Sequence, residues 1–110
     1  MESILESIKK MLGPSAQYDY FDPDIIVHIN TAFMTLRQLG VGPVEGFSIS
    51  DKNAVWADFL SDNKNLEGVK TYLYMKVKII FDPPSGSHLE ALKESIAELE
   101  WRLNAEAESV

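Results

Sequence analysis

Residues 69–103 read VKTYLYMKVKIIFDPPSGSHLEALKESIAELEWRL, and this stretch decides the fold. Its second half places leucines and isoleucine at alternating steps of three and four, which is the spacing of one face of an α-helix. Ser87 and Glu90 have the spacing of a capping box, in which each side chain accepts a backbone N–H at the helix start. The segment 82–86 (DPPSG) interrupts the pattern. The stretch therefore predicts an αα-hairpin with a proline-glycine turn.

The first half of this stretch fits two kinds of secondary structure. As a strand, residues 72–81 alternate between two faces, and their β-branched content suits a sheet. As a helix, one face collects Leu66, Val69, Leu73, Val77 and Ile80. The helical pattern begins earlier in the chain, and a lone strand would find few partners elsewhere in this sequence. The residues favour the helix and leave the strand open as an alternative.

Two amphipathic segments precede the hairpin. The first covers residues 4–12, begins near Ser3 or Glu2, and ends at the Gly-Pro pair 13–14. The second follows the sequence DPD at 22–24, where we expect Asp22 as the N-cap and Pro23 as the first helical residue. Gly40 is expected to end this second helix.

A loop rich in glycine and proline follows at residues 41–49, with at most a short extended piece at its end. Ser50 or Asp51 is then expected to cap a short helix whose inward face carries Val55, Trp56, Phe59 and Leu60. The last residues, 104–110, are acidic and lack an apolar face, so we expect a tail that is flexible or ordered on assembly. The chain is thus predicted to be one all-α domain, 1–110, a small bundle of about five helices.

The composition limits the partners that the chain can have. Its 110 residues suffice for one domain with a modest core, and the absence of cysteine excludes disulfides and thiolate metal sites. A net charge of −7 disfavours general binding to nucleic-acid phosphates or to an anionic membrane surface. The apolar runs are too short for a transmembrane helix, and the first residues lack the apolar region of a signal peptide.

No group of side chains has the pattern that catalysis or metal binding requires. Asp19, Asp22 and Asp24 lack the glycine and the distal glutamate of a calcium loop, and a helix start accounts for them better. His28 and His88 are far apart in sequence, without cysteines or matched carboxylates. Phosphate-binding loops, nucleophile elbows and zinc motifs are missing from the sequence. We therefore expect no enzymatic activity, no cofactor and no metal.

The two helices of the hairpin carry side chains suited to contacts between proteins. On the first helix, lysines are interleaved with tyrosines. Such residues could bind single-stranded nucleic acid, the lysines by charge and the tyrosines by stacking on bases, but the acidic chain favours a solvated or subunit-facing surface. Glutamates of the second helix are opposite to these lysines in charge, so the two sets of side chains could contact each other between subunits. The candidates for a subunit interface are Lys70, Tyr74, Lys78, Glu94 and Glu98.

Trp101 lies off the leucine face of the last helix. Two interpretations stay open, since tryptophan is common both in cores and at the centres of interfaces. It would pack either in a second core face or against a partner.

Several short motifs of this sequence occur together in a known family. They are the segment 21–26 (FDPDII), the helix end 36–42 (LRQLGVG), Trp56, the run 69–84 (VKTYLYMKVKIIFDPP), and the last helix with Leu92, Ile96, Leu99 and Trp101. In this combination the chain resembles the small head–tail connector proteins, also called adaptor or head-completion proteins, of tailed phages and prophages of Gram-positive bacteria. The resemblance spans nearly the whole chain.

The resemblance implies a small all-α bundle in which residues 72–81 are helical. It implies a structural virion protein of the neck, assembled in the host cytoplasm, that forms a ring of roughly twelve subunits beneath the portal. This ring would bind the portal on one side and a stopper (head-closure) or tail protein on the other. DNA would pass through its lumen without sequence-specific binding, and neither catalysis nor a membrane would be involved.

Within this expectation, the end of the last helix and the tail are candidates for docking to the portal, namely Trp101, Arg102, Asn104 and Val110. The alternative that the residues allow is a small helical interaction module or regulator without a virion role.

Overall fold

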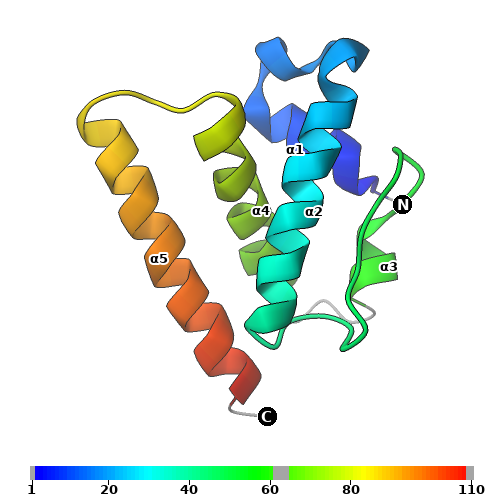
Figure 1. The fold of residues 1–110 in the computed structure, drawn as a ribbon, viewed down its shortest axis with the longest axis vertical. Coiled ribbons are helices and arrows are strands. Elements are labelled where there is room, and N and C mark those ends of the chain that lie inside the picture. The colour runs from blue at the N-terminus through cyan, green and yellow to red at the C-terminus, as the bar shows by residue number, and fades with distance from the viewer. Residues whose placement is uncertain (1, 61–64, 109–110) are drawn as a thin grey trace.

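The computed structural model describes residues 2–60 and 65–108 as an all-α fold of five α-helices (Figure 1). The helices are α1 (Ile4–Leu12), α2 (Asp22–Gln38), α3 (Trp56–Phe59), α4 (Leu66–Phe81) and α5 (Ser87–Glu108), and two 3-10 turns (Pro14–Ala16 and Asp19–Phe21) join α1 to α2. Within these described ranges there is no β-strand, and the only extended pairing is an isolated bridge between Ser3 and Val55. The predicted fold class is confirmed.

Helix α4 is the element around which the others pack. It contacts α1, α2 and α5, and its buried side chains are Val69, Tyr72, Leu73, Met75 and Val77. Residues 66–81 form one continuous α-helix, so the strand alternative for residues 72–81 is wrong. The residues offered no partner strands, and the folded chain buries this segment between helices instead.

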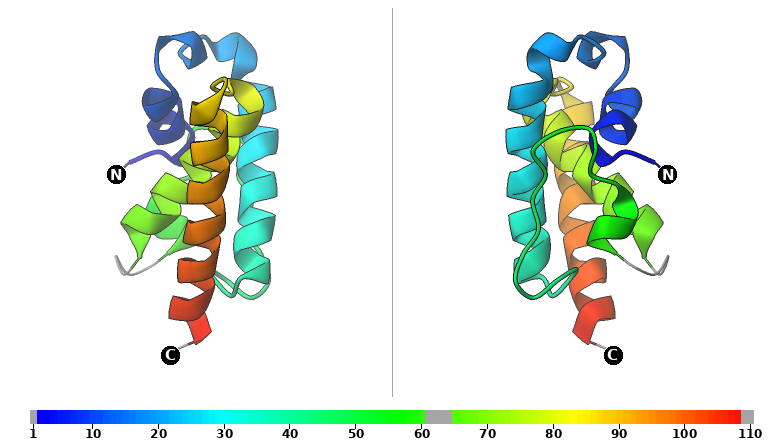
Figure 2. Two further views of the ribbon diagram at one scale, coloured as in Figure 1. Left: turned by 90° about the vertical axis from the view of Figure 1, so that its left-hand side faces the viewer. Right: turned by 90° about the vertical axis from the view of Figure 1, so that its right-hand side faces the viewer.

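Helix α5 completes the predicted αα-hairpin but contributes little to the core. Of its 22 residues only Ile96 and Leu103 are buried. It packs on α4 and forms one edge of a flat molecule that measures 39 × 35 × 19 Å. Figure 2 shows α5 along this edge, with α2 on one side of it and α1 on the other. Most of the surface of α5 is therefore available for contacts.

The remaining helices close the core on the other side of α4. Helices α1 and α2 bury their aliphatic side chains there, and the short α3 adds Trp56 and Phe59. The indole nitrogen of Trp56 donates a hydrogen bond of 3.0 Å to Oγ of Ser7, which satisfies a polar atom inside the core. Phe47 from the central loop packs on Phe33 and Phe59, with ring centroids 5.0 and 5.3 Å away. The loop is thereby held against the bundle.

The predicted helix ends are partly right. Ser3 caps α1, since its Oγ accepts a hydrogen bond from the backbone nitrogen of Glu6 at 3.2 Å, and Gly13 ends the helix. Asp22 is not the N-cap of α2, because the helix begins at Asp22 itself and Phe21 precedes it without a side-chain cap. The carboxylate of Asp22 instead contacts another helix, as described below.

The other two predicted caps are wrong. Helix α3 spans a single turn and follows Val55, whose backbone N–H donates to the carboxylate of Asp58 at 2.9 Å. Ser50 and Asp51 therefore lie in the loop ahead of it. Ser87 is the first residue of α5 and not a residue before it, so the expected capping box is not formed. In both cases a side chain with a suitable hydrogen-bond acceptor stands near the helix start, but the helix begins at a different residue from the one predicted.

Helix α5 continues to Glu108, past its predicted end at Leu103. Its last turns lie against the end of α2, where the side-chain amide of Asn104 donates to the carbonyl oxygen of Leu39 at 3.1 Å. This contact between distant segments orders part of the stretch that lacks an apolar face of its own. Residues 109 and 110 lie outside the described residues.

Within the part of the chain that the structure describes, no helix combines the length and the apolar content needed to cross a membrane.

Candidate interaction surfaces

Lys70, predicted to face another subunit, lies in a polar contact of its own chain. Its ammonium nitrogen is 2.7 Å from the carboxylate of Glu2 and 3.6 Å from that of Glu67. The same nitrogen lies 5.6 Å from the centre of the Trp56 ring, in a cation–π arrangement. The hydrogen bond with Glu2 raises the pKa of Lys70 and lowers the pKa of Glu2. Lys70 therefore attaches the segment before α1 to α4.

The other members of the predicted lysine face are also in contact with their own chain. Lys78 lies 3.3 Å from the carboxylate of Asp82, one turn further along the chain. Tyr74 is half-buried against the core. The structure thus places Lys70, Tyr74 and Lys78 along one side of α4. The two lysines are already paired with carboxylates of their own chain.

The outer side of α5 is an exposed helical surface that carries a large apolar side chain. Trp101 is 71% exposed, so the interpretation that it forms a second core face is wrong. Arg102 pairs with Glu98 at 2.8 Å, and Glu94 is exposed. Trp101 projects from this side between charged residues, as anchor residues of interfaces do.

The predicted docking residues are thus only partly brought together. Trp101 and Arg102 are exposed neighbours near the end of α5, whereas Asn104 is half-buried in its contact with Leu39. Val110 lies outside the described residues. Since Asn104 serves the packing of α5 on α2, it is a weaker candidate for contacts to a partner than the two residues before Leu103.

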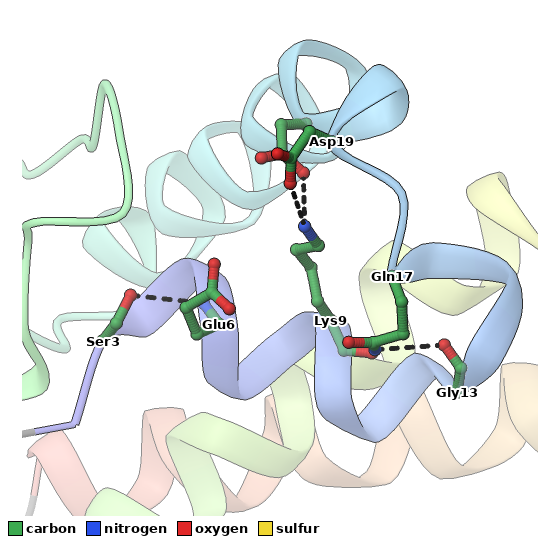
Figure 3. Close-up of polar contacts among 7 residues, drawn as sticks. Ser3, Glu6, Lys9, Gly13, Gln17 and Asp19 are labelled. Carbon is green, nitrogen blue, oxygen red and sulfur yellow. Dashed lines mark hydrogen bonds and ion pairs between the residues drawn. The ribbon is translucent and has the colours of Figure 1, made fainter.

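A buried ion pair connects α1 to the start of α2, and sequence reasoning did not find it (Figure 3). The side chain of Lys9 is only 3% exposed, and its ammonium nitrogen lies 2.8 Å from Asp22 and 3.4 Å from Asp19. Burial by itself lowers the pKa of Lys9, but the hydrogen bonds and charges of the two aspartates outweigh it and raise the pKa. The sequence shows only the two aspartates of the segment 19–22 (DYFD), and its pattern attributes these to the start of a helix.

A second polar contact connects the two helices of the hairpin. The hydroxyl of Tyr72 donates to the carboxylate of Glu100 at 2.6 Å, and Lys76 lies 3.9 Å from the same carboxylate. Burial and the negative charge of Glu100 raise the pKa of Tyr72. Glu100 therefore has a structural role, while Glu94 and Glu98 lie on the outer surface of α5.

The structure shows where the aspartates and histidines lie that were considered as possible metal ligands or catalytic groups. Asp19 and Asp22 hold Lys9, and Asp24 is exposed in the first turn of α2. His28 is half-buried on α2 and His88 is exposed at the start of α5. Among the described residues, no three histidine or acidic side chains are grouped closely enough to hold a metal ion.

A family model described as phage connector protein matches residues 4–110, from the start of α1 through the end of α5. The search of curated proteins and the search of solved structures found no significant match to this chain.

Proposed function

The chain belongs to the phage connector protein family and has the role of a phage head–tail connector; from this premise we propose that it forms a ring beneath the portal at the capsid vertex. This ring links the portal to a stopper or tail protein in the virion neck. The observation that carries the proposal is the extent of the family match, which includes all five helices. The connector acts by binding and positioning other virion proteins and not by catalysis.

The ring needs two different patches that contact each other, because subunits in a ring are arranged head to tail. The outer side of α5 supplies one patch, with Glu94 and Glu98. The other is the Lys70, Tyr74 and Lys78 side of α4. On assembly, the lysines leave the carboxylates of their own chain and pair with those of the neighbouring subunit. This exchange favours assembly only when the two surfaces are aligned so that several ion pairs form together.

Portal docking is assigned to the exposed end of α5. Trp101 supplies a large apolar surface, and Arg102 beside it can pair with a carboxylate once it leaves Glu98. This assignment is supported by the exposure of Trp101, which the isolated fold does not use for packing. Asn104 is not part of this assignment, since its side chain holds α5 on α2.

DNA passes through the lumen of the ring without sequence-specific binding. The net charge of −7 supports this, because a surface rich in carboxylates repels phosphates and leaves the strand free to move. A lumen lined by lysines would instead retain DNA in a salt-dependent manner.

The test is co-sedimentation of the purified protein with portal-bearing, DNA-filled capsids, imaged by electron microscopy. A new ring below the portal is the expected result. Absence of added density, together with a stable monomer or dimer in solution, would favour the alternative of a helical regulator. A monomer in solution is by itself compatible with the proposal, since the portal can act as the template for the ring.

The subunit contact is tested by reversing charges. Lys78→Glu is expected to reduce ring formation, and a second reversal, Glu94→Lys, is expected to restore it if the two patches meet. Lys10→Glu is the matched control, because Lys10 is an exposed lysine on α1 outside both patches. Equal assembly of Lys78→Glu and the control would exclude this pair of surfaces.

A further inference from the structure

A cleft of about 810 Å³ lies between α1, the start of α2 and the loop around residue 51. These three segments lie on the side of the molecule opposite α5 (Figure 2, right). The apolar part of the cleft is formed by Leu5, Pro23 and Ile26, of which Leu5 is buried and Ile26 half-buried. The cleft therefore lies outside the surfaces assigned to the ring and to the portal.

The rim of this cleft is acidic. Four carboxylates line it, those of Glu6, Asp19, Asp22 and Asp51, against the single ammonium group of Lys52. The buried Lys9 lies next to Asp22 and neutralises much of its charge. Figure 3 shows Glu6 and Lys9 extending from the same side of α1. The carboxylates still outnumber the ammonium groups, so the cleft attracts cations.

The carboxylate of Asp19 faces solvent although it contributes to the buried ion pair. Its side chain is 96% exposed, and one oxygen lies 3.4 Å from Lys9. The chain itself thus shows the mode of binding, in which the stem of a basic side chain is enclosed by apolar groups while its charge meets aspartates. A second cation on the outer side of Asp19 would extend this arrangement.

We propose that this cleft binds an arginine or lysine side chain supplied by another protein. The aliphatic stem of that side chain lies on Pro23 and Ile26, which are at least partly exposed, and its charged end lies among the rim carboxylates. The inference goes beyond the proposed function, because it assigns a site and a ligand chemistry that do not depend on ring formation.

Charge complementarity selects this occupant over others. Nucleic acids and anionic lipids carry the same sign of charge as the rim and are excluded. A second copy of this chain is a poor source, since it has 17 acidic against 10 basic residues and its outward helix α5 is itself acidic. A polyamine has the same charge and methylene chain as a lysine but lacks a peptide's larger apolar side chain, so its competition with a peptide is measured in the test below.

The probe is a short peptide, acetylated and amidated, with two arginines on either side of a leucine. It is titrated into the ¹⁵N-labelled full chain and followed by amide chemical shifts. The expected result is a set of shift changes confined to α1, the start of α2 and residues 50–52. Binding should weaken roughly threefold or more in the double variant Asp19→Asn/Asp51→Asn, as expected for two exposed charge contacts.

The matched control is Glu90→Gln/Glu108→Gln, which removes the same charge from exposed positions of α5 outside the proposed ring and portal contacts. It should leave the affinity unchanged. Replacing the leucine of the peptide by serine should weaken binding, and spermidine should compete poorly. Equal loss in both double variants, equal competition by spermidine, shift changes on α5, or no shift changes at all would each overturn the proposal.

Discussion

The ammonium nitrogen of Lys9 lies 2.8 Å from Oδ1 of Asp22, and this contact connects the last turn of α1 to the first residue of α2. The lysine side chain is almost fully buried, whereas that of Asp22 is 24% exposed. A buried charge is stable only when its partner is in place, because the folded chain has already removed it from water. The pair therefore determines how α1 and α2 approach each other, more than it adds to stability.

Removing the carboxylate partner should destabilise the fold. Asp22→Asn is expected to lower the free energy of unfolding by about 2–3 kcal/mol, somewhat below the usual cost of an orphaned buried charge, because Asp19 can still contact Lys9. Urea denaturation followed by circular dichroism measures this. Asp24→Asn, an exposed aspartate in the same turn, should change stability by no more than about 0.5 kcal/mol. Equal effects of the two variants would contradict a structural role of the pair.

Stability should decrease in alkaline solution. Lys9 and Tyr72 both have raised pKa values in the folded protein, compared with ordinary values of 10.5 and 10.0. Below pH 10 both groups are protonated whether the chain is folded or not, so their stabilisation is fully present. Above pH 10 the unfolded chain loses these protons first, and stability falls as the pH rises toward the pKa values of the folded state.

This alkaline effect can be assigned by substitution. The slope of unfolding free energy against pH between about pH 10 and 11.5 should be smaller in Tyr72→Phe than in the unchanged chain, since one titrating group is lost. A Tyr20→Phe variant removes a tyrosine that is 84% exposed and should keep the slope. Identical slopes in all three proteins would refute the assignment to Tyr72.

The hydrogen bond between Tyr72 and Glu100 should stabilise the hairpin. Tyr72→Phe is expected to cost about 1–2 kcal/mol at pH 7, since the bond has a charged acceptor and a buried donor. Glu100 keeps Lys76 nearby, which limits the loss. A double-mutant cycle with Glu100→Gln separates this bond from the effects of the single changes. A coupling energy near zero would show that α4 and α5 are held by apolar packing alone.

The central loop depends on a glycine that approaches an aromatic ring. Gly42 has a φ of 90°, and a Cβ atom there would lie 2.4 Å from Cε1 of Phe59. Gly42→Ala should therefore cost about 2–4 kcal/mol through overpacking and backbone strain together. Gly86→Ala in the hairpin turn, with a φ of 61° and open space around it, should cost about 1 kcal/mol. Thermal unfolding of both variants checks the order; a larger loss at Gly86 would contradict it.

Trp101 should matter for assembly and not for folding. Trp101→Ala is expected to leave the free energy of unfolding within about 0.5 kcal/mol of the unchanged chain, because the side chain is largely exposed. The same variant should sediment less with portal-bearing capsids. Leu103→Ala, two residues further and buried, is the contrasting variant and should cost about 2–4 kcal/mol in stability. Normal capsid binding by Trp101→Ala would remove it from the docking surface.

The strand alternative for residues 72–81 shows where local pattern stops being informative. A run such as YLYMKVKIIF satisfies both periods, because lysines and tyrosines are tolerated on either a solvated strand face or a helix flank. Packing resolves the conflict, since α4 buries one side against α2 and another against α5. A segment buried on two sides has less polar patterning than a surface helix, and so its sequence resembles a strand.

The candidate surfaces also combine features that helical spacing predicts with features that depend on distant residues. The exposure of Glu94 and of Arg102 follows from their place off the leucine face of α5, and such positions can be read from helical spacing alone. The pairing of Lys70 with Glu2 could not, because 68 positions separate the two residues and neither belongs to a motif. The exposure of Trp101 was also undecided by pattern, since its helix face could have been covered by another element.

The sequence by itself determined the helices that become α1, α2 and α5 and the turns that separate them, because apolar spacing, proline and glycine act on the chain within a few residues. It left residues 72–81 open between helix and strand. It also determined the acidic character that excludes general binding of nucleic acid. Only the tertiary structure decided that Asp22 holds Lys9 and does not cap α2, and that α5 extends to Glu108 along the end of α2. Those outcomes depend on which distant groups meet, and burial makes an ion pair or a final helical turn favourable only where a partner from another helix is present.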